Sequence, residues 1–280
     1  MLNNIFLKLV SESLLSLYPV FIKKIPTSLD NQLLSRMIGY AVIPIFFMSI
    51  AELKQNLLTK EVMTLSMITF VHILYSYKGF QNLDSGIAYT IFYMYPILLI
   101  FWENKTFSPF YLVTLLGLIL VSVDLKNPKK DLENLTKVKG IFYLFIALIT
   151  EVMIYYSVKS IKGKNQWNSL FYSYFPALVI YSIYYYLRIY KKKEDNVEED
   201  TQKSKYLIYG IIAFNIIVGL AGYYLRFYTI KKLPTKLYSV LSYFGIIMSY
   251  VYGVVLEGQK ITIQQIIGTL LIIYSNYCFL

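Results

Sequence analysis

The sequence predicts an all-α polytopic membrane protein with ten transmembrane helices, arranged as two inverted five-helix repeats. Three observations lead to this prediction. The chain of 280 residues is 57% hydrophobic and only 15% charged, whereas soluble domains carry about 25% charged residues. Its apolar residues form continuous runs of roughly 18 to 22 residues, the length that a helix needs to cross a bilayer, and not the alternating pattern of a barrel. The two halves of the chain also carry similar patterns of apolar runs and turns.

Ten apolar runs divide the chain, and each predicts one membrane-crossing helix. They lie at about 4–22, 33–51, 61–79, 84–102, 109–125, 138–157, 168–188, 206–228, 234–256 and 262–279. Most connections between them are short, so neighbouring helices are expected to be antiparallel. Two connections are longer and polar, at 126–140 and 191–205. The first of these separates five runs from five.

An internal repeat relates the two halves when the second is shifted back by about 150 residues. Without a gap, this shift aligns Leu83 with Leu233, Tyr93 with Tyr243 and Ile97 with Ile247, and one further residue of shift aligns Gly117 with Gly268 and Leu120 with Leu271. A repeat with an odd number of crossings must have its second copy inverted in the membrane. We therefore expect a first repeat at 1–126, a linker at 127–137 and a second repeat at 138–280.

Charge, cysteine content and missing motifs argue against several classes of function. The net charge of +11 comes mostly from Lys and Arg at the ends of apolar runs, where they contact lipid headgroups, so no nucleic-acid partner is expected. The single cysteine, Cys278, excludes an internal disulfide and a thiolate metal cluster. The chain lacks HExxH, Gly-x-Ser-x-Gly and Walker motifs. We therefore expect neither an enzyme nor a metal or cofactor site. Met1–Asn4 lacks the basic region of a signal peptide, so the first helix is expected to remain.

The end of the chain resembles a known family of transporters. The last two predicted helices carry LPTKLYSVLSYFGIIMSYVYGVVLEGQKITIQQIIGTLLIIYSNY, Leu233 to Tyr277. This stretch is similar to the last two helices of the EamA-type branch of the drug/metabolite transporter superfamily. The similar features are a Leu-Pro turn, the Glu257-Gly258 turn, Thr262, and Gly268 early in the last helix. The first repeat matches less completely: it has the mid-helix Pro96, but it carries Thr106 where the second repeat has Glu257.

The resemblance implies a bundle with both termini in the cytoplasm. It also implies a central cavity lined by the first, third, fourth, sixth, eighth and ninth helices. The superfamily includes exporters of amino acids and metabolites and carriers of nucleotide sugars and sugar phosphates. The distribution of Lys and Arg favours the opposite orientation, because the loops after odd-numbered helices carry more of them. The orientation and the identity of the membrane therefore stay open.

Two glutamates lie inside apolar runs, each in the first helix of its repeat. Glu12 and Glu151 each follow a hydroxyl residue, Ser11 or Thr150. Inserting a charged aspartate at the centre of a membrane helix costs about 2.5–3.5 kcal/mol, and a charged glutamate is comparable. A carboxylate at such a position therefore predicts a substrate-binding or proton-carrying role. The alternative is structural. Lys8 lies one turn before Glu12 and could neutralise it, and the two hydroxyls could bond either to a carboxyl or to the backbone.

Five further polar residues of the predicted helices are candidates for substrate binding. His72, the only histidine, could bind substrate or titrate, or could simply pack between helices. Tyr93 and Tyr243 lie on helices that the resemblance places at the cavity, although most of the 29 tyrosines are expected to pack or to lie at the membrane interface. Asn215 could bond to another helix or face the cavity. Arg226 could hold an anionic substrate, although an interfacial anchor is the more ordinary role.

Together these features predict a secondary transporter that moves a small polar metabolite across a membrane by alternating access, with proton coupling left open. Few basic residues lie deep in the later helices, which favours an amine-bearing or neutral substrate. The competing hypothesis is a non-transporting scaffold or receptor on a transporter fold. Paired glutamates in a cavity would count against that hypothesis, and a cavity filled by tyrosine rings would count for it. The expected partners are the lipid bilayer and the small molecule.

Overall fold

The computed structural model describes residues 1–25, 27–104, 108–123, 134–192 and 201–278. Every regular element in these ranges is a helix. In chain order they are α1 (Leu2–Leu15), α2 (Tyr18–Lys24), α3 (Leu29–Val42), the short η1 (Ile43–Phe46), α4 (Ile50–Asn56), α5 (Lys60–Asn82), α6 (Ser85–Phe92), α7 (Tyr95–Asn104), α8 (Phe110–Ser122), α10 (Leu135–Ser160), α11 (Gln166–Lys192), α12 (Thr201–Phe214), the π-helical η2 (Asn215–Leu220), α13 (Ala221–Lys232), α14 (Thr235–Ser242), α15 (Phe244–Glu257) and α16 (Ile263–Tyr277).

Several of these helices are long and apolar enough to cross a membrane. Five helical stretches of the described chain meet that requirement: Leu2–Lys24, Ser85–Glu103, Leu135–Ser160, Tyr206–Lys232 and Thr235–Glu257. A sixth is added if α4 and α5, which meet at a bend of 94°, form one span. Large apolar side chains such as Phe6, Met67, Leu187, Ile217 and Leu270 are exposed on the outside of the bundle, where lipid would cover them. The predicted multi-pass integral membrane protein is therefore confirmed.

One predicted helix is wrong in its second half. The run at 33–51 was expected to be continuous, but α3 ends at Val42 and is followed by η1. Pro44 explains this end, because proline lacks the N–H that an α-helix needs and its ring clashes with the carbonyl one turn earlier. The chain resumes in α4, where the Ser49 side chain accepts a hydrogen bond from the Glu52 N–H.

The other nine predicted runs contain helix over most of their length. Thr106, most of the predicted linker at 127–137, and the ends of the runs at 109–125 and 262–279 lie outside the described residues.

The predicted fourth and ninth runs, at 84–102 and 234–256, break at corresponding points. Helix α6 covers Ser85–Phe92 and helix α14 covers Thr235–Ser242, so both have eight residues and their bounds match at the shift of the repeat. Each is followed by a longer helix, α7 or α15. Pro96 lies at the start of α7, and Pro234 is the residue before α14, as expected of residues that interrupt or start helices.

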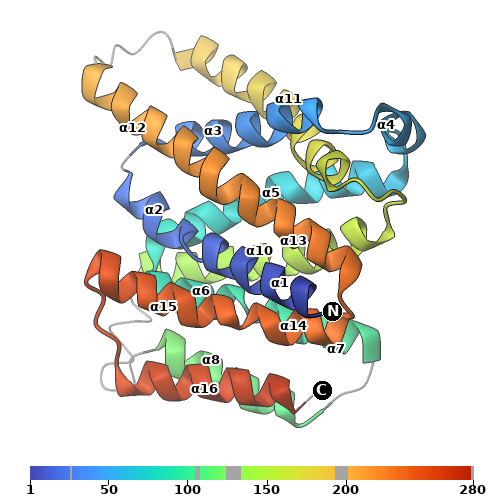
Figure 1. Cartoon of the computed structure of the whole chain (residues 1–280). Helices are drawn as coiled ribbons and strands as arrows, with labels where there is room; N and C mark the ends of the chain where they lie inside the picture. The colour runs from blue at the N-terminus through green and yellow to red at the C-terminus, as the bar shows by residue number, and fades with distance from the viewer. Residues whose placement is uncertain (26, 105–107, 124–133, 193–200, 279–280) are drawn as a thin grey trace.

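Helices α8 and α16 pack against each other in opposite directions on one side of the bundle (Figure 1). Thr114 near the start of α8 bonds to Ser275 near the end of α16, at 2.7 Å. Between them, a Cβ atom on Gly117 would lie 2.6 Å from the Gly268 carbonyl oxygen, and a Cβ on Gly268 would lie 2.6 Å from the Gly117 carbonyl oxygen. Only glycine permits this approach. A reciprocal contact of this kind is expected where two segments are related by a two-fold axis.

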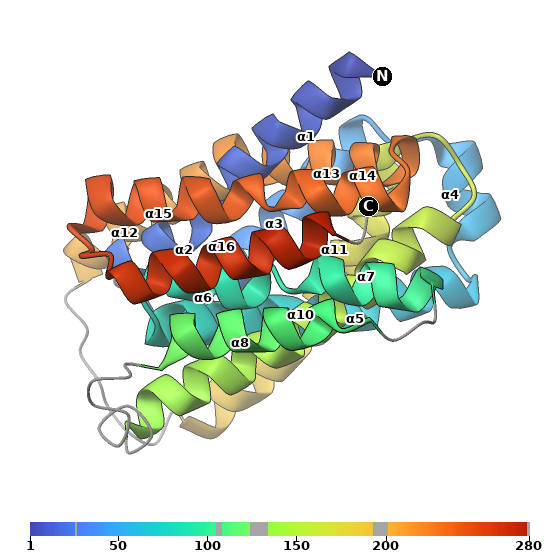
Figure 2. The same ribbon diagram turned by 90° about the horizontal axis from the view of Figure 1, so that it is seen from below.

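Helices α3, α11 and α12 lie on the side of the bundle opposite to α8 and α16 (Figure 1). Helices α1, α5, α10 and α13 lie between these two sides. Both termini lie at the same end of the bundle, which the view from below shows as well (Figure 2).

Candidate substrate-binding site

Among the described residues, five charged side chains are buried in the centre of the bundle. They are Lys8, Glu12, Arg36, Glu151 and Arg226, and each has a relative exposure of 2% or less. Removing a charge from water costs several kcal/mol unless a partner of opposite sign accompanies it. The contacts of these five side chains therefore decide what the interior can bind.

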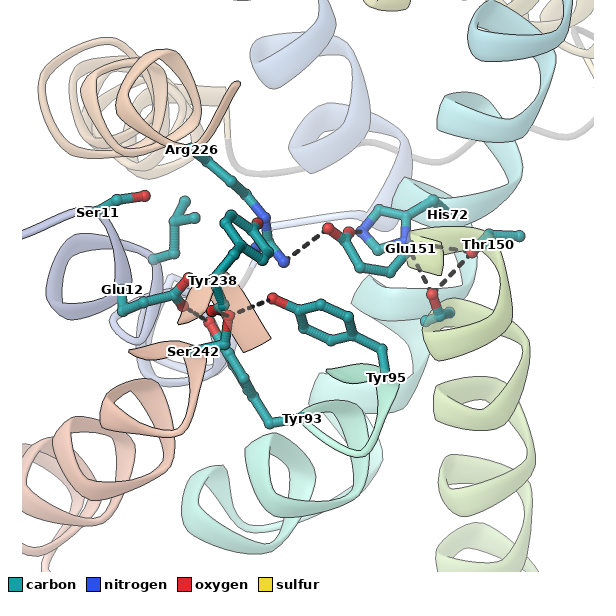
Figure 3. Close-up of polar contacts among 12 residues, drawn as sticks. Ser11, Glu12, His72, Tyr93, Tyr95, Thr150, Glu151, Arg226, Tyr238 and Ser242 are labelled. Carbon is teal, nitrogen blue, oxygen red and sulfur yellow. Dashed lines mark hydrogen bonds and ion pairs between the residues drawn. The ribbon is translucent and has the colours of Figure 1, made fainter. Parts of the chain in front are cut away.

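Glu12 is held by partners from two helices. The Lys8 ammonium, one turn earlier in α1, donates to one carboxylate oxygen. The Tyr93 hydroxyl after α6 donates to the other (Figure 3). The Lys8 nitrogen also lies 3.4 Å from the ring centroid of Tyr238 in α14, a cation–π contact. The i,i+4 pair that the sequence suggests is present, but it lies in the interior of the bundle.

Glu151 joins three helices. One oxygen of this α10 residue lies 2.6 Å from Nη2 of Arg226 in α13, and the other lies 3.4 Å from Nε2 of His72 in α5 (Figure 3). The prediction that Arg226 anchors its helix at the membrane interface is wrong. Its side chain is buried, and its guanidinium points between Glu12 and Glu151. The cost of burying that guanidinium is offset by Glu151, which comes from a helix distant in sequence.

The contacts of His72 constrain where a proton lies. Its Nδ1 is 3.0 Å from the Ala147 carbonyl oxygen, and because a carbonyl only accepts, Nδ1 carries a hydrogen. In a neutral imidazole Nε2 then has a lone pair, which faces a Glu151 oxygen. That contact, at 3.4 Å, is not a hydrogen bond, because Glu151 Oε2 has no hydrogen-bond partner among the described residues. His72 is therefore held by the α10 backbone through Nδ1, and its Nε2 lies beside the Glu151–Arg226 pair.

The hydroxyl residues before the two glutamates bond to the backbone. Ser11 donates to the Gly222 carbonyl at 2.8 Å, which ties α1 to α13. Thr150 donates to carbonyls one turn earlier in α10, and its oxygen also lies 3.2 Å from Nδ1 of His72. Neither hydroxyl is recorded as a partner of a carboxylate among the described residues.

Arg36 is the buried cation that the sequence analysis did not single out. It extends from α3, and its Nη2 donates to the Tyr174 hydroxyl at 2.8 Å. Five tyrosine rings surround its guanidinium at 4.4 to 5.6 Å from carbon to centroid, and we call them the tyrosine cage: Tyr18, Tyr40, Tyr77, Tyr174 and Tyr223. The sequence signal was present but weak, since one arginine lies near the start of the run at 33–51.

Asn215 lies beside the tyrosine cage. Its carbonyl oxygen accepts from the Tyr18 hydroxyl at 3.0 Å, and its amide donates to Ser35 at 3.0 Å. It also begins η2, and such π-helical turns are frequent at functional sites. Tyr243 stands apart: it is buried, and its hydroxyl has no partner among the described residues. The aligned Tyr93 and Tyr243 therefore differ in their contacts, because the Tyr93 hydroxyl donates to Glu12 and the Tyr243 hydroxyl does not bond to a described residue.

The space between these side chains is nearly closed. A cavity of about 10 Å³ is lined by residues that include Arg36, Arg226, His72, Ser76 and Tyr223, and a water molecule needs about 10–15 Å³. Larger cavities lie elsewhere, such as one of about 470 Å³ with an almost entirely apolar lining between α15 and α16. The polar centre therefore has no room for an organic ligand in this structure.

Comparison with known proteins gives the family. The model of the EamA-like transporter family matches residues 138–280. No curated protein matches the chain. Among solved structures 15 chains match, and one crystal structure of a protein superposes with a TM-score of 0.66 at 13% identity, over 98% of this chain and 96% of that chain. At this identity the likeness shows a common fold alone. The family match covers just over half of the sequence, and the chain belongs to the EamA-like transporter family.

Proposed function

We propose that the protein is a secondary transporter that carries a small polar metabolite across its membrane by alternating access. Its ten helical segments would form two inverted repeats, 1–126 and 138–280, and the substrate would bind at the buried polar centre. The observation that carries the proposal is a pair of matching ion-pair contacts, one at each end of the bundle. They are called the Lys23 latch and the Lys159 latch.

The Lys23 latch closes one end. Lys23, in the last turn of α2, lies 2.9 Å from a carboxylate oxygen of Glu257, the last residue of α15. The same ammonium donates to the Leu83 carbonyl, in the turn between α5 and α6, at 3.2 Å. The latch therefore joins the end of the first helical segment to the end of the ninth and to the turn before the fourth.

The Lys159 latch has the same plan at the opposite end (Figure 1). Lys159, near the end of α10, lies 3.6 Å from a carboxylate oxygen of Glu103 near the end of α7. It also donates at 2.6 Å to Thr235, the first residue of α14. In both latches a lysine from the first segment of one proposed repeat holds the fourth segment of the other. Two inverted repeats would produce this pattern, because each repeat would supply the lysine of one latch and the glutamate of the other.

Alternating access follows from two latches of modest strength. An ion pair with partly exposed partners contributes about 0–1 kcal/mol, so either latch can open during a cycle. Opening one exposes the polar centre to one side of the membrane while the other stays closed. With both latches formed and the centre nearly filled, the structure corresponds to the occluded step of such a cycle.

Breaking each latch is expected to expose the centre to opposite sides. Ser76→Cys in a Cys278→Ser chain is the reporter, because Ser76 lines the central cavity and is buried. In sealed vesicles, Lys23→Gln should raise labelling of this introduced thiol by a membrane-impermeant maleimide from one side only, and Lys159→Gln from the other. Mass spectrometry gives the labelled fraction, and Lys54→Gln on the exposed face of α4 serves as the matched control.

The same measurement decides the competing function. A non-transporting scaffold is favoured by one observation: the tyrosine cage fills much of the centre. The paired, buried glutamates favour transport. Labelling that stays absent from both sides in both latch variants would rule out alternating access and leave the scaffold. Labelling from the same side in both would contradict the inverted repeats.

A further inference from the structure

The buried charges of the centre do not balance. Lys8 pairs with Glu12 and Arg226 pairs with Glu151, and each pair sums to zero whichever partner holds the proton. Arg36 is the buried arginine left over, since it makes no ion pair with an acidic group among the described residues. An arginine stays protonated in proteins. The described interior therefore carries one positive charge in excess.

The surroundings of Arg36 attract a cation but give it no counter-charge. The tyrosine cage presents ring faces, and the closest is Tyr223 at 4.4 Å. Its guanidinium donates to the neutral Tyr174 hydroxyl and also hydrogen-bonds to Tyr77, which is neutral as well. The Nε atom is buried without a partner among the described residues. A polar group that is buried and unsatisfied is costly and is often explained by a function.

The position of Arg36 connects this unsatisfied donor to the proposed substrate site. It lines the same small cavity as Arg226, His72 and Ser76. A guanidinium presents Nε and Nη as a planar fork that matches the two oxygens of a carboxylate. The cavity of about 10 Å³ is too small for an organic molecule. A ligand can therefore reach Arg36 only if side chains of the tyrosine cage change their rotamers.

We propose that Arg36 binds the carboxylate of the transported molecule, so that the substrates are small organic acids with one negative charge. The inference rests on the proposed transport function and adds a substrate class to it. A single carboxylate brings the interior to neutrality, whereas a phosphate monoester, with about −1.5 to −2 charges, would overshoot. An amine would add a second uncompensated positive charge. The amine-bearing or neutral substrate expected from the sequence is therefore disfavoured.

The test is thermal unfolding of the full chain in detergent with fragments of matched size and constant ionic strength. Benzoate, butyrate and acetate supply the carboxylate, benzamide is the neutral control, benzylamine the cation and phenyl phosphate the dianion. At least one monocarboxylate is expected to raise Tm saturably, by several degrees at about 100 times Kd. Benzamide and benzylamine should have no effect, and phenyl phosphate should act more weakly than benzoate.

Two substitutions of Arg36 tie the effect to this side chain. Arg36→Gln should abolish the response, and Arg36→Lys should weaken it because the fork is lost. If Arg36→Gln does not fold, Tyr174→Phe tests the same site. This variant frees Nη2 of Arg36 from its bond to the Tyr174 hydroxyl, so the Kd of the monocarboxylate should fall about tenfold. Lys54→Gln should respond as the unaltered protein does.

Three results would overturn the inference: no response to any monocarboxylate, an unchanged response in Arg36→Gln, or stronger stabilisation by phenyl phosphate than by benzoate. If the thiol of the Ser76→Cys reporter is still labelled from opposite sides in the two latch variants, the transport proposal survives any of them.

Discussion

Replacing Glu151 by leucine is expected to cost about 3–5 kcal/mol of folding free energy, the usual penalty for removing one partner of a buried ion pair. Arg226 lies 2.6 Å from Glu151 and is 1% exposed, so it would be left as an uncompensated buried cation. His72 would lose its contact with the carboxylate, which lies 3.4 Å from Nε2. The loss is measured from denaturant or thermal unfolding in detergent.

The double replacement isolates the pair. Glu151→Leu with Arg226→Met removes both charges and fills the space with flexible apolar side chains, so it should recover most of the loss. Glu257→Leu breaks the partly exposed Lys23 latch instead and should cost less than about 1 kcal/mol. A double variant no more stable than Glu151→Leu would show that Arg226 does not depend on this carboxylate.

Replacing Gly117 or Gly268 by alanine is expected to push α8 and α16 apart. The added Cβ would lie 2.6 Å from a backbone carbonyl oxygen of the facing helix, and backbone cannot yield as a flexible side chain can. Forced overpacking of this kind costs about 1–3 kcal/mol. Because the contact is reciprocal, the two variants should lose similar amounts. Unfolding in detergent measures both.

Gly210 in α12 is the matched control, since a Cβ there would meet nothing within 4 Å. Gly210→Ala should be neutral or stabilise the protein by about 0.5–1 kcal/mol through helix propensity. Combining Gly117→Ala with Gly268→Ala should cost less than the sum of the single losses, because helices already separated by one methyl group accommodate the second. Strict additivity, or no loss in either single variant, would contradict the close approach of α8 and α16.

The sequence by itself determined the features that depend on short stretches of chain. Hydrophobic runs of membrane length place the helices, because transferring a polar backbone into lipid requires that each segment satisfy its own hydrogen bonds. Lys8 and Glu12 could be paired in advance because residues four apart share a helix face. The start of α7 beside Pro96 and the start of α14 after Pro234 follow from the chemistry of proline. Pro44 ends α3 for the same reason.

Only the tertiary structure decided which buried polar groups meet. Arg226 and Arg36 look alike in sequence, as basic residues in apolar runs, yet one faces Glu151 and the other faces five tyrosines. Tyr93 and Tyr243 align in the repeat, but only Tyr93 reaches a carboxylate. These outcomes depend on how each helix is rotated and tilted against its neighbours. Hydropathy places a helix in the membrane but does not specify that rotation, because packing between helices sets it.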